Sequence, residues 1–286
     1  TNIPSIYAVG DCALVKNMLT GKKCYSAMGS TANITGRILA KALSGEDEEY
    51  KGCLSTAVIK ASSSLNIGRT GLTMEKAQQE GFDPECVSVV VDDKPGYYPG
   101  SGNFVIKLVA DRKSLRLLGV QVAGKGNVDK IVDSTVVAIV MGAKLNDLDS
   151  ADFSYAPPFS TALHPLQVAS YVLENKIRGV LDSFPPYEYM MGEAKGYSVI
   201  DVNNAPTIPG AKFVAFDKIE ETFRNTAKDE KLLLVCARGR KSYLVQNKLK
   251  AMGFTNTKSL EGGVNLNDVK VRFEGAIPMD EVKRVK

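Results

Sequence analysis

A short apolar run that leads directly into a cationic, cysteine-containing loop places the strongest constraint on this chain. Residues 232–235 are Leu-Leu-Leu-Val, which predicts a buried strand. Residues 236–243 follow as Cys-Ala-Arg-Gly-Arg-Lys-Ser-Tyr, and the spacing of Leu244, Leu249 and Met252 predicts a helix after them. The chain therefore delivers one thiol to the N-terminus of a helix, as in a strand–loop–helix unit of an α/β fold.

Cys236 is the candidate nucleophile of this loop. A helix N-terminus and neighbouring cations both favour the thiolate over the thiol. Successive backbone N–H groups at such a turn bind anions, and a glycine suits the turn because it takes a positive φ at little cost. The predicted loop for an anionic sulfur donor comprises Arg238, Gly239, Arg240, Lys241 and Ser242.

Two other interpretations of the loop are weaker. A phosphatase loop of the cysteine-and-arginine type needs an arginine six positions after the cysteine, and that position is Ser242. A structural cysteine at a strand end is the plainer alternative, because buried cysteines are common. Three cations within five positions of Cys236 do not describe a core environment, however, and they favour the nucleophile.

The same segment resembles the active-site loop of a rhodanese domain. Asp201 matches the aspartate after the first rhodanese strand, residues 209–213 resemble the segment that leads into the second, and residues 261–263 (Glu-Gly-Gly) match the turn after the last. Asn203 stands where that family often has arginine, and the chain has no tryptophan to follow the Gly-Gly turn. The resemblance implies sulfurtransferase chemistry through a persulfide on Cys236.

Length and composition describe an ordinary globular protein of about two domains, with room for more than one core. The chain has 286 residues, 44% of them hydrophobic and 24% charged. Residues 183–286 hold 17 Lys and Arg against 13 Asp and Glu, so they carry the whole net charge of +4. This excess is too small for a nucleic-acid interface and suits a small anionic substrate.

The cysteine and histidine content argues against a metal site. Five cysteines without a CxxC pair and a single histidine, His164, do not form a zinc-ligand pattern. Unpaired cysteines and the lack of a signal peptide favour a cytoplasmic location. The longest apolar run, around residues 135–143, is too short to span a bilayer.

The first residues predict a buried strand over 6–9, a turn at Gly10 and Asp11, and a helix that begins near Thr31. The pattern Thr-x-x-Pro-x-Ile-Tyr-Ala-x-Gly-Asp resembles the last FAD-contacting motif of the flavin-dependent pyridine nucleotide–disulfide oxidoreductases. In that family, the aspartate at the position of Asp11 hydrogen-bonds the ribityl chain of the flavin. A carboxylate after a strand end is suited to accept hydrogen bonds from sugar-like hydroxyls.

A dinucleotide-binding fingerprint is missing from the sequence, because the glycines of residues 119–126 have the wrong spacing. The resemblance therefore implies the C-terminal part of a longer enzyme that uses FAD and NAD(P)H. We expect that this part does not retain these cofactors by itself.

Residues 54–178 show an α+β pattern. It comprises strands over 55–61, 87–91, 103–109 and 117–123, helices over 73–81 and 128–141, and a further helix that ends at 177. This segment resembles the dimerisation domain of the same oxidoreductases, and most closely that of the coenzyme A-disulfide reductase branch. The apolar helix over 128–141 and the Tyr-Pro loops predict a homodimer.

Two tyrosine motifs carry the resemblance to this branch, at residues 96–100 (Gly-Tyr-Tyr-Pro-Gly) and 155–160 (Tyr-Ala-Pro-Pro-Phe-Ser). The resemblance implies that Tyr155, and Tyr97 or Tyr98, reach the coenzyme A sulfur site of the partner subunit. A phenol can donate a proton to a departing thiolate. Stiffening of the loops is the alternative role. His164-Pro165 resembles the catalytic histidine of glutathione-reductase relatives, but a cap or surface histidine explains it more simply.

The sequence thus predicts mixed α/β and α+β architecture in three parts: the end of a flavin-binding domain (1–50), a dimerisation domain (54–180) and a rhodanese-like domain with a parallel sheet (186–286). The predicted function is reduction of coenzyme A disulfide, persulfide or polysulfide, with sulfur transfer at Cys236 to or from a small sulfur donor or acceptor. A non-catalytic rhodanese-type binding module and an NADH oxidase of the same flavoprotein family remain the alternatives.

Overall fold

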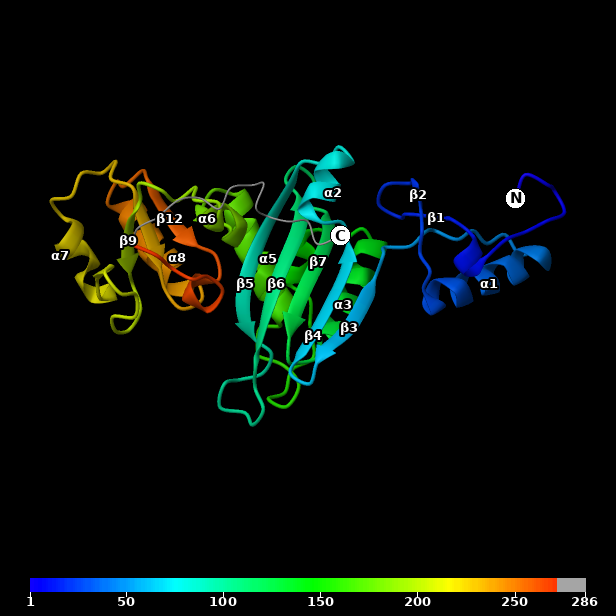
Figure 1. Cartoon of the computed structure of the whole chain (residues 1–286), viewed down its shortest axis with the longest axis horizontal. Helices are drawn as coiled ribbons and strands as arrows, with labels where there is room; N and C mark the ends of the chain where they lie inside the picture. The colour runs from blue at the N-terminus through cyan, green and yellow to red at the C-terminus, as the bar shows by residue number, and fades with distance from the viewer. Residues whose placement is uncertain (272–286) are drawn as a thin grey trace.

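The computed structural model describes residues 1–271 (Figure 1). The last residues of the predicted rhodanese-like part, 272–286, lie outside the described range. The first part of the chain contains β1 (Val15–Lys16), β2 (Lys23–Cys24) and α1 (Gly29–Leu43). The middle part contains β3 (Ala57–Ser62), β4 (Leu65–Gly71), α2 (Met74–Gln79), β5 (Pro84–Asp92), β6 (Asn103–Asp111), β7 (Leu117–Gly124), α3 (Val128–Val140), α4 (Leu145–Asp149) and α5 (Pro165–Ile177). The last part contains β8 (Ser183–Phe184), α6 (Pro186–Met190), β9 (Ser198–Asp201), β10 (Lys212–Phe213), α7 (Ile219–Phe223), β11 (Leu232–Val235), α8 (Arg240–Ala251) and β12 (Thr257–Leu260).

The N-terminal segment extends to one side of the middle part in Figure 1. Helix α1 forms where it was predicted, but the buried strand predicted over residues 6–9 is wrong. Ile6 is 50% and Tyr7 57% exposed, and in the described chain no strand pairs with this stretch. A strand needs a neighbour to accept its hydrogen bonds, so apolar residues alone do not form one.

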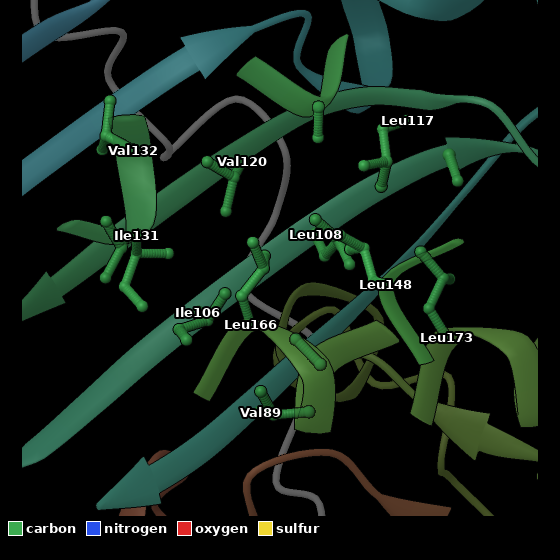
Figure 2. Close-up of a cluster of buried hydrophobic side chains, with 14 of the residues drawn as sticks. Val89, Ile106, Leu108, Leu117, Val120, Ile131, Val132, Leu148, Leu166 and Leu173 are labelled. Carbon is green, nitrogen blue, oxygen red and sulfur yellow. The ribbon is translucent and has the colours of Figure 1, made fainter. Parts of the chain in front are cut away.

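The middle part is a five-stranded antiparallel sheet in the order β3-β4-β7-β6-β5. Helix α3 packs against β4 and β7, and α5 packs against β5 and β6. Figure 2 shows the core between the sheet and these helices, where Val89, Ile106 and Leu108 face Ile131 and Leu166. The predicted strands and helices of this segment are confirmed, and Thr73 caps α2 by accepting from the backbone N–H of Lys76 at 3.2 Å.

The last part is a parallel sheet in the order β10-β9-β11-β12-β8. Strand β11 lies in its centre, between β9 and β12. Leu232 and Leu234 enter one core, with residues of α7 and α8, whereas Leu233 and Val235 enter a second core on the opposite face. A central strand covered on both faces is apolar at every position, which explains the continuous run in the sequence.

The parallel arrangement gathers the carboxyl ends of the strands at one edge of the sheet. Asp201 is the last residue of β9, Cys236 follows β11 directly, and Glu261 follows β12 directly. Ligands of open α/β sheets bind at this edge. The predicted α/β and α+β architecture with a parallel sheet is thus confirmed, whereas the limits given for the three domains stay predictions.

A buried ionic network joins the two sheets. The Lys176 Nζ, at the end of α5, lies 2.7 Å from the Glu261 Oε1 and 3.4 Å from the Glu85 Oε1. Glu261 also accepts from the backbone N–H of Ser88 at 2.8 Å and from the Ser183 hydroxyl at 2.7 Å. Burial lowers the pKa of Lys176, but the two carboxylates outweigh that effect and leave it raised. Lys176 is therefore charged at neutral pH.

No helix of the described residues is long and apolar enough to cross a membrane.

Replacing Lys176 with methionine leaves Glu261 buried, with 2% of its side chain exposed, and without its cation. We expect Lys176→Met to lower the free energy of unfolding by about 3 kcal/mol, since an uncompensated charge is left in the interior. The double variant Lys176→Met/Glu261→Gln should recover part of this loss. Urea unfolding followed by circular dichroism measures both.

The exposed pair Lys218–Glu221, at 3.1 Å, provides the matched control for that experiment. Lys218→Met should leave the urea midpoint nearly unchanged, because solvent screens an exposed ion pair. Equal midpoints for Lys176→Met and Lys218→Met would contradict the role assigned to the buried network.

Candidate functional site

The sulfur of Cys236 lies inside a ring of hydrogen-bond donors formed by the loop between β11 and α8. The Cys236 Sγ accepts from the backbone N–H of Gly239 at 3.1 Å and of Ser242 at 3.5 Å. The Cys236 thiol itself donates to the Ser242 hydroxyl oxygen at 3.7 Å. Backbone N–H groups that converge on one point bind the anions that approach it. This arrangement can stabilise a thiolate or a persulfide.

The loop has the turn geometry that the sequence predicted. Gly239 has φ +99°, in the left-handed region that glycine adopts readily, and it immediately precedes the first turn of α8. The Ser242 hydroxyl donates to the Gly239 carbonyl at 2.8 Å and shares a hydrogen bond with the Ser259 hydroxyl at 2.6 Å. These bonds hold the donors around the sulfur in place.

The three cations of the loop have different surroundings. Arg238 forms an ion pair of 2.8 Å with Asp92, the last residue of β5. Lys241 donates a hydrogen bond to Asn204. Arg240 is exposed and has no acidic partner among the described residues. It is therefore the cation of the loop that is most available to an anionic substrate.

The Gly-Gly turn after β12 holds the cysteine loop in place through backbone hydrogen bonds. The backbone N–H of Val264 donates to the Cys236 carbonyl, and that of Asn265 donates to the Ala237 carbonyl, each at 3.0 Å. Gly263 has φ +54°, and a Cβ on it would lie 1.9 Å from the Cys236 carbonyl oxygen. Only glycine allows the two segments to approach this closely.

Asp201 supports the loop that follows β9, and its hydrogen-bond partners are residues of that loop. Its carboxylate accepts from the backbone N–H groups of Asn203, Thr207 and Ile208 at 3.0, 2.6 and 3.0 Å. Burial raises the pKa of Asp201, but these hydrogen bonds outweigh it and leave the pKa lowered. Asn203 donates to the same carboxylate at 2.9 Å, so it orders this loop in place of the arginine common at its position.

Cys236 is buried, with 3% of its surface exposed. This burial, taken alone, is what a cysteine with a purely structural role would show. The two backbone N–H groups that donate to its sulfur favour the interpretation of Cys236 as a nucleophile, because a cysteine that only packs in a core needs no such donors. A predominantly apolar cavity of about 520 Å³ lies beside the loop, lined by Arg238, Gly239 and Arg240 on one side.

The tyrosines lie on two loops of the middle part. Tyr97 is 77% exposed and Tyr98 half-buried on the loop between β5 and β6, and Tyr155 is 50% exposed on the loop between α4 and α5. The two loops line one small cavity through Asp93, Lys94 and residues 158–160. None of the three tyrosines lines this cavity or the cavity beside the cysteine loop, so the structure does not bring them together with Cys236.

His164 is a buried helix cap. Its Nδ1 accepts from the Leu166 backbone N–H at 3.3 Å at the start of α5, and its ring stacks on Phe153 at 4.2 Å. Burial, and then the nearby Lys130, lowers the pKa of His164 to about 4, so the ring is neutral at pH 7. Of the two predicted roles, the helix cap is confirmed, whereas a surface position is wrong because only 2% of the residue is exposed.

Asp11 lies exposed in a 3-10 turn, Gly10–Cys12, that packs against α1. An exposed carboxylate there fits the role of acceptor for hydroxyl groups of a bound flavin. Within residues 1–271, no group of three or more His, Cys, Asp or Glu side chains is placed to hold a metal ion.

Sequence reasoning missed Lys176, Ser259 and Asp92. The sequence predicts Glu261 only as part of a turn, and its ion pair with Lys176 spans 85 positions of the chain. Ser259 lies in β12 between Lys258 and Leu260, and Asp92 ends β5. No local pattern signals these partners, so only the folded chain reveals the contacts.

Two protein families match consecutive segments of the chain. Residues 60–166 match the pyridine nucleotide-disulphide oxidoreductase dimerisation domain, and residues 168–266 match the rhodanese-like domain. A protein of Pyrococcus furiosus named NAD(P)H sulfur oxidoreductase (CoA-dependent) is 36% identical over 174 residues, which are 61% of this chain and 39% of the relative.

Two solved structures resemble both sheets together. One is described as an NAD-dependent persulfide reductase from A. fulgidus (TM-score 0.83) and the other as reduced Bacillus anthracis CoADR-RHD (TM-score 0.84). Each is 30% identical and covers 92% of this chain. The chain spans 48% of each of these structures, about half their length.

Replacing Gly263 with alanine should displace the Cys236 carbonyl and with it the donors around the sulfur. We expect Gly263→Ala to lower the rate of sulfur transfer from thiosulfate to cyanide on the order of 100-fold, because small misplacements cost this much. Gly253→Ala is the matched control, since Gly253 also has a positive φ (+92°) but open space around it. A normal rate for Gly263→Ala would refute the bracing role.

Proposed function

Because the chain belongs to the pyridine nucleotide-disulphide oxidoreductases and carries a rhodanese-like domain, we propose that it transfers sulfane sulfur through a persulfide on Cys236. The observation that carries this proposal is the ring of backbone N–H donors around the Cys236 Sγ, at 3.1 and 3.5 Å. Cys236 follows β11 directly, at the carboxyl edge of the parallel sheet, where ligands of such folds bind.

The proposed reaction at Cys236 is attack of a thiolate on a sulfur–sulfur bond. The thiol first loses its proton to solvent. The thiolate then attacks the terminal sulfur of the donor, the sulfur–sulfur bond of the donor breaks, and the remainder leaves as sulfite or as a thiolate. Cys236 keeps the transferred sulfur as a persulfide anion, which the N–H groups of Gly239 and Ser242 stabilise.

The arginines assist by charge. An incoming donor is anionic, and Arg240 has no acidic partner among the described residues. Arg238 is positioned by Asp92 at 2.8 Å and holds the loop against β5. Loss of either should weaken donor binding more than the intrinsic reactivity of the thiol.

For the whole enzyme, we propose reduction of a coenzyme A disulfide, persulfide or polysulfide by NAD(P)H through FAD in a cytoplasmic homodimer. When bound, the flavin would supply hydride transfer, and Asp11 would hydrogen-bond its sugar-like chain. Tyr155, Tyr97 and Tyr98 would act at the sulfur site of the partner subunit. This proposal is supported by the match of residues 60–166 to a dimerisation domain and by relatives named for reactions of this kind.

A non-catalytic binding module is the second candidate, and the 3% exposure of Cys236 is the observation that favours it. Such a module would hold a sulfur carrier without forming a covalent intermediate. An NADH oxidase would not need the cationic cysteine loop, so the loop argues against that alternative.

Treatment with polysulfide or thiosulfate should add one sulfur atom to the peptide that contains Cys236, as measured by mass spectrometry. Cys236→Ser should abolish this addition and reduce thiosulfate:cyanide transfer to background, because the hydroxyl of serine is a far weaker nucleophile at neutral pH. Cys12→Ser, at an exposed cysteine, is the control and should change neither. Normal transfer by Cys236→Ser would sink the assignment, whereas a parent protein that neither gains sulfur on Cys236 nor transfers it would favour the binding module.

A further inference from the structure

Two thiols that the proposed function does not use lie together in the N-terminal part of the chain. The Cys24 Sγ is 3.3 Å from the Cys53 Sγ, although the residues are 29 positions apart. Cys24 is the last residue of β2, and Cys53 lies after α1, shortly before the first strand of the middle sheet. The fold, and not the local sequence, brings these two sulfurs into contact.

Backbone hydrogen bonds attach Cys53 to the hairpin of β1 and β2. The Cys53 N–H donates to the Lys16 carbonyl at 2.8 Å, and the Cys53 carbonyl accepts from the Met18 N–H at 3.0 Å. Cys24 pairs with Val15 in the same hairpin. Both thiols therefore belong to one hydrogen-bonded unit, which fixes the distance between their backbones.

The turn of the hairpin and the residue before Cys53 are shaped for this contact. The buried Asn17 side chain accepts from the N–H groups of Leu19 and Thr20 at 3.0 and 3.1 Å and orders the turn. Gly52 has φ +118°, and a Cβ on it would lie 2.7 Å from the Lys16 carbonyl oxygen. Only glycine lets the segment that carries Cys53 approach the hairpin this closely.

The arrangement is close to that of a disulfide. The sulfurs are 3.3 Å apart and bond at about 2.0 Å, so closure needs an approach of roughly 1.3 Å. Cys24 is partly exposed, whereas Cys53 is buried with 8% of its surface exposed. A small reagent can therefore reach the first thiol, and the second is already in place to displace it.

We propose that Cys24 and Cys53 form a dithiol site that small organic disulfides convert into an intramolecular disulfide. The site is separate from Cys236 and goes beyond the proposed function. The new bond closes a loop that contains α1 and fixes the β1–β2 hairpin to the segment that enters the middle sheet.

The conversion is two successive thiol–disulfide exchanges. The Cys24 thiolate attacks one sulfur of the reagent, whose sulfur–sulfur bond breaks, and the first organic thiolate leaves. The Cys53 thiolate then attacks the Cys24 sulfur, the bond to the remaining organic group breaks, and the second organic thiolate leaves. The protein loses two electrons and two protons, and the reagent gains them and becomes two thiols.

The ionisation of the pair sets the rate. Burial, and then the contact with Cys53, raises the pKa of Cys24 to about 11, so this thiol is protonated at pH 7. Burial, and then Cys53, also raises the pKa of the neighbouring Tyr50, so its phenol is neutral up to pH 9. We expect the rate of closure to rise about tenfold from pH 7 to pH 8, because only the thiolate attacks.

Oxidised glutathione and the smaller bis(2-hydroxyethyl) disulfide are the two probes, each applied to the 286-residue chain. Mass spectrometry should show the loss of two hydrogen masses and a link between the peptides of Cys24 and Cys53, and dithiothreitol should reverse both changes. The exposed Cys12 should take up an adduct, which shows that the reagent is active. Cys86, whose pKa burial also raises to about 11, should remain a thiol in the core of the middle part.

Two variants separate a positioned pair from two independent thiols. Cys53→Ser should leave a lasting glutathione adduct on Cys24, because the second exchange is lost. Gly52→Ala should slow the link on the order of tenfold by moving Cys53 away from the hairpin, although both thiols are kept. Gly45→Ala is the matched control, since Gly45 also has a positive φ (+91°) but open space around it.

The outcome that would overturn the inference concerns the parent protein at pH 9. Cys24 and Cys53 that stay as thiols with both reagents would show that the pair does not react. A lasting adduct on Cys24 without the link to Cys53 would show that the second thiol cannot reach the first. Equal rates of closure for Gly52→Ala and Gly45→Ala would show that the close approach at Gly52 does not position the pair.

Discussion

The carboxylate of Glu261 connects the two halves of the structure. It follows β12, precedes the Gly-Gly turn that braces the cysteine loop, and pairs with Lys176 at 2.7 Å across the domain boundary. A buried charge is tolerated only when its partners are complete, and here Ser88 and Ser183 occupy its remaining acceptor sites. The position of the loop relative to the middle sheet therefore depends on this carboxylate and its partners.

The geometry around Cys236 fits a reactive thiol better than a cysteine that only fills space in a core. Two backbone N–H groups converge on its sulfur, and Gly263 approaches its carbonyl at a distance that no larger residue allows. The apolar cavity beside the loop has one wall in each folded part. The proposed reactions, sulfur transfer and disulfide reduction, share the attack of a thiolate on a sulfur–sulfur bond, which would give a physical reason for the fusion of the two domains.

Much of the fold could be predicted from local patterns. The alternation and length of the runs at β5, β6 and β7, and the helical period of α3, are properties of single segments. The strand predicted over residues 6–9 failed because a strand depends on a neighbour, which a local pattern does not report. His164 was predicted as a cap or a surface residue, and only packing against Phe153 makes it buried and neutral.

The sequence alone determined the candidate nucleophile, the glycine that turns its loop and the order of the predicted segments, because each depends on residues within one turn or one strand. Tertiary structure decided which cation of the loop remains unpaired, which lysine neutralises Glu261, and that a cavity joins the two parts beside Cys236. Those features depend on side chains up to 146 positions apart, such as Asp92 and Arg238, and only the folded chain brings such residues together.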